Sequence, residues 1–149
     1  MRFFIKGYLV SMLAGVISLV ANQALAVTAP GATMKNSFPQ DNLCLSTSSY
    51  GGIVNNCNYS VQVVGSLQLS TGYHAASISI YGNNSWCQTA SINGVGNASW
   101  MSFQIYTTSS GSKSWQTLNL GNVHVYDDTG TIFRCSLEAG GYIGNFTAQ

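Results

Sequence analysis

The ionisable side chains that could carry out acid–base chemistry are few in this sequence. Outside the first 26 residues there are two histidines and four acids: His74, His124, Asp41, Asp127, Asp128 and Glu138. A serine–histidine–acid triad needs a nucleophile beside a histidine, and no Gly-x-Ser-x-Gly elbow occurs. A glycosidase needs carboxylates on opposite sides of a cleft, whereas Asp127 and Asp128 are adjacent, in a turn that favours hydrogen bonds to the backbone. We therefore predict no catalytic residues and a protein that is not an enzyme.

The four cysteines, Cys44, Cys57, Cys87 and Cys135, indicate disulfides rather than a metal centre or a nucleophile. They lack the closely spaced pairs of a structural zinc site, and a calcium site on the turn at 127–128 has too few acidic ligands. An even number of cysteines in a small exported domain is typical of a disulfide framework. Three pairings are open; we favour Cys44–Cys57, which closes a local loop, with Cys87–Cys135, which joins distant strands. No metal or cofactor is predicted.

Aromatic side chains offer binding chemistry that the charged residues do not. The candidate ligand-binding residues are Trp86, Trp100, Trp115, Tyr81 and Tyr106. Strand alternation predicts that Tyr81 and Tyr106 stand on polar faces, where they would form an exposed platform for a glycan or a partner protein. The alternative interpretation, which we favour, is that they pair across strands and shield a sheet from solvent.

The first 26 residues have the features of a secretory signal peptide of bacterial type. Arg2 and Lys6 give a positive start, residues 9–21 are an almost unbroken apolar run, and Ala24-Leu-Ala26 is a small-x-small cleavage site. The apolar run is shorter than the roughly 20 residues that span a bilayer. We therefore predict a secreted protein, extracellular or periplasmic, with no membrane span after cleavage.

The charge balance excludes two classes of partner. Beyond the signal peptide there are three cations against four anions, a formal charge of −1. Three scattered cations can neutralise neither a nucleic-acid backbone nor an anionic membrane surface. The surface must be covered by uncharged residues, namely Ser, Thr, Asn, Gln, Gly and Tyr. This composition suits contacts with sugars or proteins.

The elements that must position these residues are short β-strands. The run 131–137 places Phe133, Cys135 and Leu137 on one face, and the run 76–81 alternates in the same way. Such runs recur about every ten residues between turn signals. This spacing predicts an all-β fold, an antiparallel β-sandwich of about seven to eight short strands stapled by disulfides.

Two further runs carry expectations about individual residues. The run 99–107 predicts a strand that buries Met101, Phe103 and Ile105. Gly65 interrupts an alternating run, which predicts a bulge or a break at that position.

The length allows one ordinary domain beyond the signal peptide. Residues 27–42 contain Pro30, Gly31 and Pro39 without a sustained period, and we predict a flexible N-terminal segment there. Residues 43–149 are then the β-sandwich domain.

The motifs around the cysteines form one more pattern. Cys44 is followed by Asn55-Asn-Cys57, an alternating strand leads to Cys87, and the Leu-rich run 116–121 precedes Cys135-Ser-Leu137. This layout, over about residues 43–146, resembles a poorly characterised group of bacterial secreted four-cysteine β-sandwich domains, although it lacks the proline usual after the second and fourth cysteines. The resemblance implies a β-sandwich and supplies no activity or site.

Three hypotheses on function follow. The first is a secreted, non-enzymatic β-sandwich domain with a role in surface interaction or structure. The second is a carbohydrate-binding, lectin-like module. The third, a small secreted hydrolase or a toxin-like effector, ranks last because acids and bases are so few. The expected partner is a protein or a glycan.

Overall fold

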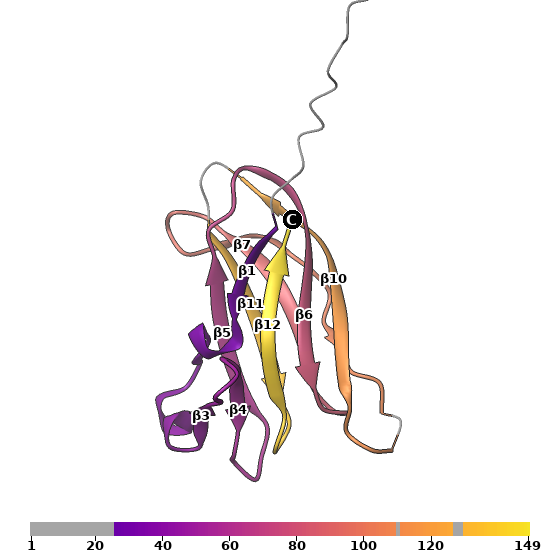
Figure 1. Cartoon of the computed structure of the whole chain (residues 1–149). Coiled ribbons are helices and arrows are strands. Elements are labelled where there is room, and N and C mark those ends of the chain that lie inside the picture. Colours follow the sequence, from indigo (N-terminus) through magenta and orange to yellow (C-terminus); the bar gives the residue numbers. More distant parts are fainter. Residues whose placement is uncertain (1–25, 110, 127–129) are drawn as a thin grey trace, which may run out of the picture.

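The computed structural model describes residues 26–109, 111–126 and 130–149 of the 149-residue chain. Twelve strands in this part of the chain form two antiparallel sheets that pack face to face (Figure 1). The predicted antiparallel β-sandwich is confirmed. The predicted signal peptide, apart from its last residue Ala26, lies outside the described residues, and so does the turn at 127–129.

The first sheet, sheet A, has the order β10-β6-β12-β4-β3, with β1 added beside β12. β1 and β4 pair with different parts of one side of β12, and β1, β12, β6 and β10 lie side by side in Figure 1. Its strands are β1 (Val27–Pro30), β3 (Leu45–Thr47), β4 (Ile53–Asn55), β6 (Gly72–Tyr81), β10 (Trp115–Val125) and β12 (Tyr142–Ala148).

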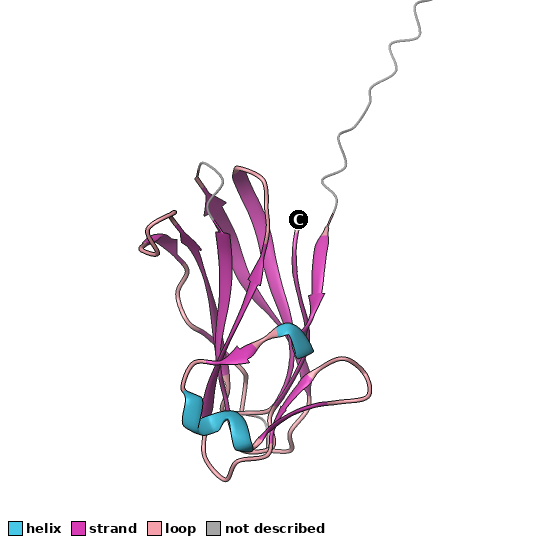
Figure 2. Cartoon of the chain, turned by 90° about the vertical axis from the view of Figure 1, so that its left-hand side faces the viewer, coloured by secondary structure: helices cyan, strands magenta, loops and turns pink. Residues whose placement is uncertain are grey.

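The second sheet, sheet B, has the order β2-β5-β11-β7-β8, with β9 added beside β7. Its strands are β2 (Lys35–Asn36), β5 (Val61–Leu67), β7 (Trp86–Ile92), β8 (Ala98–Met101), β9 (Ile105–Tyr106) and β11 (Gly130–Leu137). Two 3-10 helices, η1 (Gly31–Thr33) and η2 (Pro39–Leu43), are cyan in Figure 2. No helix among the described residues is both long and apolar enough to cross a membrane. Several strands have only two to four residues, too short for alternation to reveal, which is why the count exceeds the predicted seven to eight.

The core lies between the sheets and follows the predicted alternation. Phe133, Cys135 and Leu137 of β11 are fully buried, which confirms the inward face of that strand. Phe133 meets Phe146 of β12 at a centroid distance of 4.8 Å, so the two sheets contact through aromatic rings. Burial of each such side chain contributes about 1.5–3 kcal/mol.

Gly65 does not produce the predicted bulge or break. β5 runs through it in unbroken register with β11, and Gly65 pairs with Phe133. A Cβ atom at position 65 would lie 2.8 Å from Met34 Cγ and from Phe146 Cζ. The glycine therefore leaves space for two core side chains, and the prediction was wrong because sequence alternation does not show what packs above a strand.

The run 99–107 also differs from its prediction. It is divided into β8 and β9, and Met101 and Phe103 are 57% and 89% exposed rather than buried. Met101 is exposed although it is still paired with Ala90 in β8. At Ser102 the side-chain hydroxyl accepts the backbone N–H of Thr89 at 3.0 Å in place of a ladder carbonyl, and residues 102–104 leave the sheet before β9 pairs with β7.

Residues 27–42, predicted to be flexible, are instead part of both sheets. β1 pairs with β12, and β2 pairs with β5. Between them Met34 is 3% exposed within the core. Gly31 fits against the backbone of Ile143, where a Cβ atom would have no room. This segment therefore closes one side of the sandwich.

Both favoured disulfides are confirmed. Cys44–Cys57 joins the two ends of the β3–β4 hairpin, with a Cα–Cα distance of 5.1 Å. Cys87–Cys135 links directly opposed residues of β7 and β11, with a Cα–Cα distance of 4.1 Å. The second pair is distant in sequence but adjacent within sheet B.

Candidate functional site

The described carboxylates act as structural acceptors. Glu138 accepts the backbone N–H of Asn83 at 2.6 Å and lies 3.8 Å from Lys113 Nζ. Asp41 is buried and accepts a hydrogen bond from Tyr59 Oη at 3.1 Å. This bond, with some desolvation and the negative charge of Asp41, raises the pKa of the Tyr59 phenol. Over the described part of the chain, no three His, Cys, Asp or Glu side chains are grouped so as to hold a metal ion.

A hollow lined by aromatic and small polar residues lies on the outer face of sheet A. Its volume is about 670 Å³, and it extends from β10 across β6 and β12 to β1 and the β3–β4 hairpin. We call it the aromatic hollow. Its lining residues, none of them charged, are Thr28, Pro30, Tyr50, Ser79, Trp115, Tyr142, Gly144 and Asn145.

Trp115 lines the aromatic hollow from the first residue of β10. It begins β10 directly opposite Tyr81 of β6, and the two ring centroids are 5.7 Å apart. The Tyr142 ring stands edge-on to it, at 4.9 Å and 80°. A Cβ atom at Gly144 would lie 3.3 Å from Trp115 Cζ3, so the indole lies directly against the β12 backbone. The ring is thus held by neighbours on two strands, β6 and β12, while 54% of the residue stays exposed.

A bulge in β12 brings Tyr142 to this face. In a regular strand Tyr142 would share a face with Phe146, which is buried in the core. The register between β12 and β6 shifts between Ile143 and Phe146, where the two residues Gly144 and Asn145 stand opposite the single residue Ser79. The extra residue reverses the alternation, so Tyr142 points outward, and glycine at position 144 leaves room for the indole.

The β3–β4 hairpin supplies the rim of the aromatic hollow. Tyr142 Oη is hydrogen-bonded to Ser48 Oγ, and its ring lies so close to Gly52 that a Cβ atom there would have no room. Tyr50 stands at the hairpin tip and is almost fully exposed. The hairpin therefore fixes one tyrosine of the hollow and presents another to solvent.

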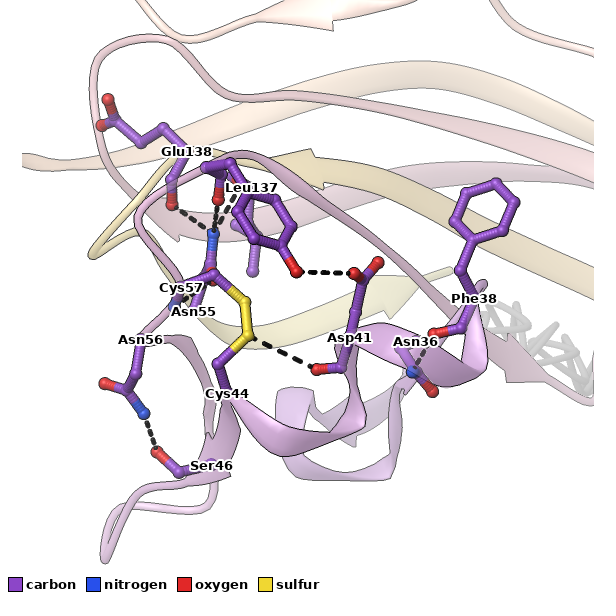
Figure 3. Close-up of a disulfide and its surroundings, with 11 residues drawn as sticks. Asn36, Phe38, Asp41, Cys44, Ser46, Asn55, Asn56, Cys57, Leu137 and Glu138 are labelled. Carbon is purple, nitrogen blue, oxygen red and sulfur yellow. Dashed lines mark hydrogen bonds between the residues drawn. A yellow bond between two sulfur atoms is a disulfide. The ribbon is translucent and has the colours of Figure 1, made fainter.

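The base of this hairpin is held in two ways (Figure 3). The Cys44–Cys57 disulfide joins its ends covalently. The buried side-chain amide of Asn55 donates to the backbone carbonyls of Leu137 and Glu138, at 3.0 and 2.9 Å. These bonds tie the hairpin to the end of β11 in sheet B.

The five sequence-predicted aromatic residues do not form one site. Trp115 lines the hollow, and Tyr81 supports its ring from beside it. Trp86 and Tyr106 face each other in sheet B, so Tyr81 and Tyr106 stand in different sheets and share no platform. Trp100 is half-buried on β8 and packs against the core.

Two aromatic residues of the hollow, Tyr50 and Tyr142, were not among the predicted site residues. Loops have no period, and nothing but the flanking Gly51-Gly52 marks Tyr50 as part of a tight turn. For Tyr142 the available signal was the Gly144-Asn145 pair, which is typical of a bulge.

Comparisons with known proteins identify the fold. Neither a protein-family model nor a curated protein sequence matches this chain. Among solved structures, the chain is similar to the C-terminal CBM6 of LamC, a marine laminarinase from Zobellia galactanivorans, with a TM-score of 0.54 and 10% identity over 84% of this chain and 99% of that one.

Two further structures are similar. One is CBM6cm-2, a carbohydrate-binding module from Cellvibrio mixtus lichenase 5A in complex with cellotriose, with a TM-score of 0.52 and 10% identity over 83% of this chain and 95% of that one. The other is the insecticidal crystal protein Cry2Aa, with a TM-score of 0.56 and 10% identity over 84% of this chain and 21% of that one. At such identity these likenesses show a shared β-sandwich fold alone.

Proposed function

We propose that this chain is a non-catalytic carbohydrate-binding module whose binding surface is the aromatic hollow of sheet A. The observation that carries the proposal is Trp115, a ring that is fixed by its neighbours yet has a free face. Pyranose rings present C–H groups on their faces, and these pack against aromatic rings. Because the indole is already ordered before a ligand arrives, little conformational entropy is lost on binding.

The polar lining of the hollow supports the same ligand class. Thr28 and Ser79 bring hydroxyl groups to the lining of the hollow, and Asn145 brings an amide. These groups donate and accept hydrogen bonds, and so do the hydroxyl groups of a sugar. A few polar groups around a largely apolar surface are typical of small-molecule sites.

Two of the similar structures bear the name of carbohydrate-binding modules, and one of them contains cellotriose. They support the glycan-binding hypothesis over an unspecified structural role, which was ranked first from the sequence. Two disulfides in a small domain and the predicted signal peptide support a location outside the cytosol, where such bridges persist. Membership in the bacterial four-cysteine group stays a prediction.

Titration with a panel of soluble polysaccharides, by affinity electrophoresis and then calorimetry, tests the proposal. We expect Trp115→Ala to weaken binding by at least about 30-fold, the loss typical of an aromatic hot spot. The matched control is Phe103→Ala, which removes another exposed aromatic ring, on the loop between β8 and β9. Thermal unfolding of both variants verifies that each is folded.

Two results overturn the proposal. One is the absence of glycan binding by the wild-type protein across the panel. The other is equal weakening of binding by Phe103→Ala and Trp115→Ala, because it would mean that any exposed ring suffices.

A further inference from the structure

The outer face of sheet A continues beyond the aromatic hollow as a strip of small polar side chains. A second hollow of about 300 Å³ lies further along β6 and β10, and its lining includes Ser77, Thr117, Asn119 and Thr147. Ser77 and Ser79, the latter in the aromatic hollow, are two residues apart on β6 and point to the same side. The two hollows therefore follow one another along a single face.

A second aromatic cluster lies at the far end of this face. Tyr73 of β6 is directly opposite His124 of β10, and their rings stack at 4.1 Å and 8°. The Tyr126 ring follows, 4.0 Å from His124. Tyr73 is 72% exposed although its ring is held by this stack. The cluster thus repeats the main property of Trp115, an ordered ring with a free surface.

The two aromatic groups share one face because β6 alternates without interruption. Ala76, Ile78 and Ile80 are buried, so Tyr73 and Tyr81 both point outward. Eight residues separate these tyrosines along the strand, a distance of about 26 Å. A mono- or disaccharide reaches one of the two groups, whereas an extended chain of several sugar rings contacts both.

The lining of both hollows contains no Asp, Glu, Lys or Arg. A polymer of uronic acids or sulfated sugars would find no lysine or arginine in either hollow to balance its charge. Hydroxyl and amide groups from Ser77, Thr117 and Asn119 suit neutral sugars, which both donate and accept hydrogen bonds.

From this arrangement we propose that the ligand is a neutral linear polysaccharide that lies along β6 and is bound by both aromatic groups, Trp115 with Tyr142 at one end and Tyr73 with His124 and Tyr126 at the other. The inference rests on the proposed function, which it extends from a single hollow to the whole length of the sheet. It makes Tyr73 a binding residue for long chains.

Calorimetry with oligosaccharides of two lengths tests this inference. The probes are the hexasaccharides of β-1,4-glucan, β-1,3-glucan, β-1,4-mannan and β-1,4-xylan, each with its disaccharide, and polygalacturonate is the charged comparison. We expect one or more hexasaccharides to bind at least about tenfold more tightly than their disaccharides, because the second aromatic group adds contacts without a second loss of translational freedom. Polygalacturonate should not compete.

Two variants separate the ends of the path. Tyr73→Ala should weaken hexasaccharide binding about tenfold and leave disaccharide binding unchanged, whereas Trp115→Ala should weaken both. Ser77→Glu, which places a longer charged side chain between the two groups, should also weaken only the hexasaccharide. Its matched control is Ser66→Glu, at an exposed position on β5 in sheet B.

The outcomes distinguish the two proposals. If Trp115→Ala abolishes binding and Tyr73→Ala leaves hexasaccharide affinity unchanged, the long path is wrong and the proposed function stands. If polygalacturonate is the only ligand that binds, and Trp115→Ala abolishes that binding, the neutral ligand along the long path is likewise wrong and the proposed function stands. If Trp115→Ala has no effect on any ligand, both proposals fail.

Discussion

The outer faces of the two sheets differ in the side chains that surround their aromatic rings. On sheet B, Arg134 lies over the Trp86 ring, 5.9 Å from its centroid, and donates two hydrogen bonds to Gln62, at 3.2 Å from Nε and 2.6 Å from Nη2. Gln88 of the same face is only 7% exposed and donates to the sulfur of Met101. Long side chains therefore cover the Trp86 ring.

On sheet A the Tyr81 and Tyr142 rings stand beside Trp115, and the residues beneath the indole are small. Gly144 and Ser79 lie beneath or beside the indole and do not reach over it. Trp86 and Trp115 thus have the same chemistry, and what differs is whether the protein itself occupies the ring face. Aromatic content alone therefore does not show which ring has a free face; the side chains that lie over each ring do.

The largest expected changes in stability come from loss of the disulfides, one of which lies in sheet B and the other at the β3–β4 hairpin of sheet A. Replacement of Cys87 and Cys135 by Ala opens a loop of 48 residues in sheet B and should lower the free energy of unfolding by about 4 kcal/mol. Replacement of Cys44 and Cys57 opens a loop of 13 residues and should lower it by about 3 kcal/mol. Urea unfolding of the two double variants measures both values.

The two double cysteine variants should affect glycan affinity in the opposite order to their effects on stability. The hairpin disulfide positions Ser48 and Tyr50, so its loss should weaken binding, while loss of the sheet B bridge should leave the affinity of the folded protein unchanged. Binding is measured at low temperature, where both variants remain folded. Equal weakening by the two changes would mean that the hollow depends on global stability rather than on the hairpin.

Substitutions at two glycines should also separate an effect on stability from an effect on glycan binding, with smaller changes than those expected for the disulfides. Gly65→Ala introduces a Cβ atom 2.8 Å from two core side chains and should cost about 1–3 kcal/mol through overpacking. Gly144→Ala meets only the edge of the exposed Trp115 ring, at 3.3 Å, and should change stability by less than about 0.5 kcal/mol. Thermal unfolding compares the two.

In binding, Gly144→Ala should have the larger effect because it displaces the indole from its position over β12. We expect a several-fold loss of glycan affinity for this variant and none for Gly65→Ala, by calorimetry. A loss of affinity in Gly65→Ala alone would contradict the assignment of the site to the outer face of sheet A.

The sequence was sufficient to predict what regular alternation determines. β11 was predicted correctly because every second residue from Phe133 to Leu137 faces the core without interruption. The sequence left three cysteine pairings open, and the favoured one is confirmed. Where a local device interrupts alternation the prediction failed, as at Ser102, whose hydroxyl replaces a ladder acceptor.

The site was less predictable than the fold, for the same physical reason. Tyr142 reaches the outer face through a bulge, and Tyr50 stands in a loop. A platform shared by Tyr81 and Tyr106 was the less favoured of two interpretations, and it fails because alternation gives only the face of a strand, not the sheet to which the strand belongs. The favoured one, pairing across strands, agrees with their positions opposite Trp115 and Trp86. Strand order is set by long-range contacts that no local pattern contains.

Arg134→Ala tests whether the cover over Trp86 accounts for the difference between the faces. Loss of the cation–π contact should lower the free energy of unfolding by about 0.5–1 kcal/mol. In a variant whose other tryptophans are replaced by phenylalanine, acrylamide should quench Trp86 fluorescence more strongly after the change. Unaltered quenching would show that Arg134 does not cover this ring in solution.

The smallest expected effect concerns the hydrogen bond from Tyr59 to Asp41, which lies near the Cys44–Cys57 disulfide. This bond raises the pKa of Tyr59 above the usual phenol value of 10.0. Because the folded-state pKa is the higher one, the contribution of the bond to stability is complete below about pH 10 and is lost as the pH rises through the folded-state pKa.

Difference absorbance titration of the wild-type protein against Tyr59→Phe isolates this phenol from the other tyrosines. Asp41→Asn should lower the pKa of Tyr59 toward its usual value, since it removes the charged acceptor. The glycan affinity of both variants should be unchanged at neutral pH, because the disulfide still holds the hairpin. A phenol that titrates at its usual pKa in the wild-type protein would mean that the hydrogen bond from Tyr59 to Asp41 does not form in solution.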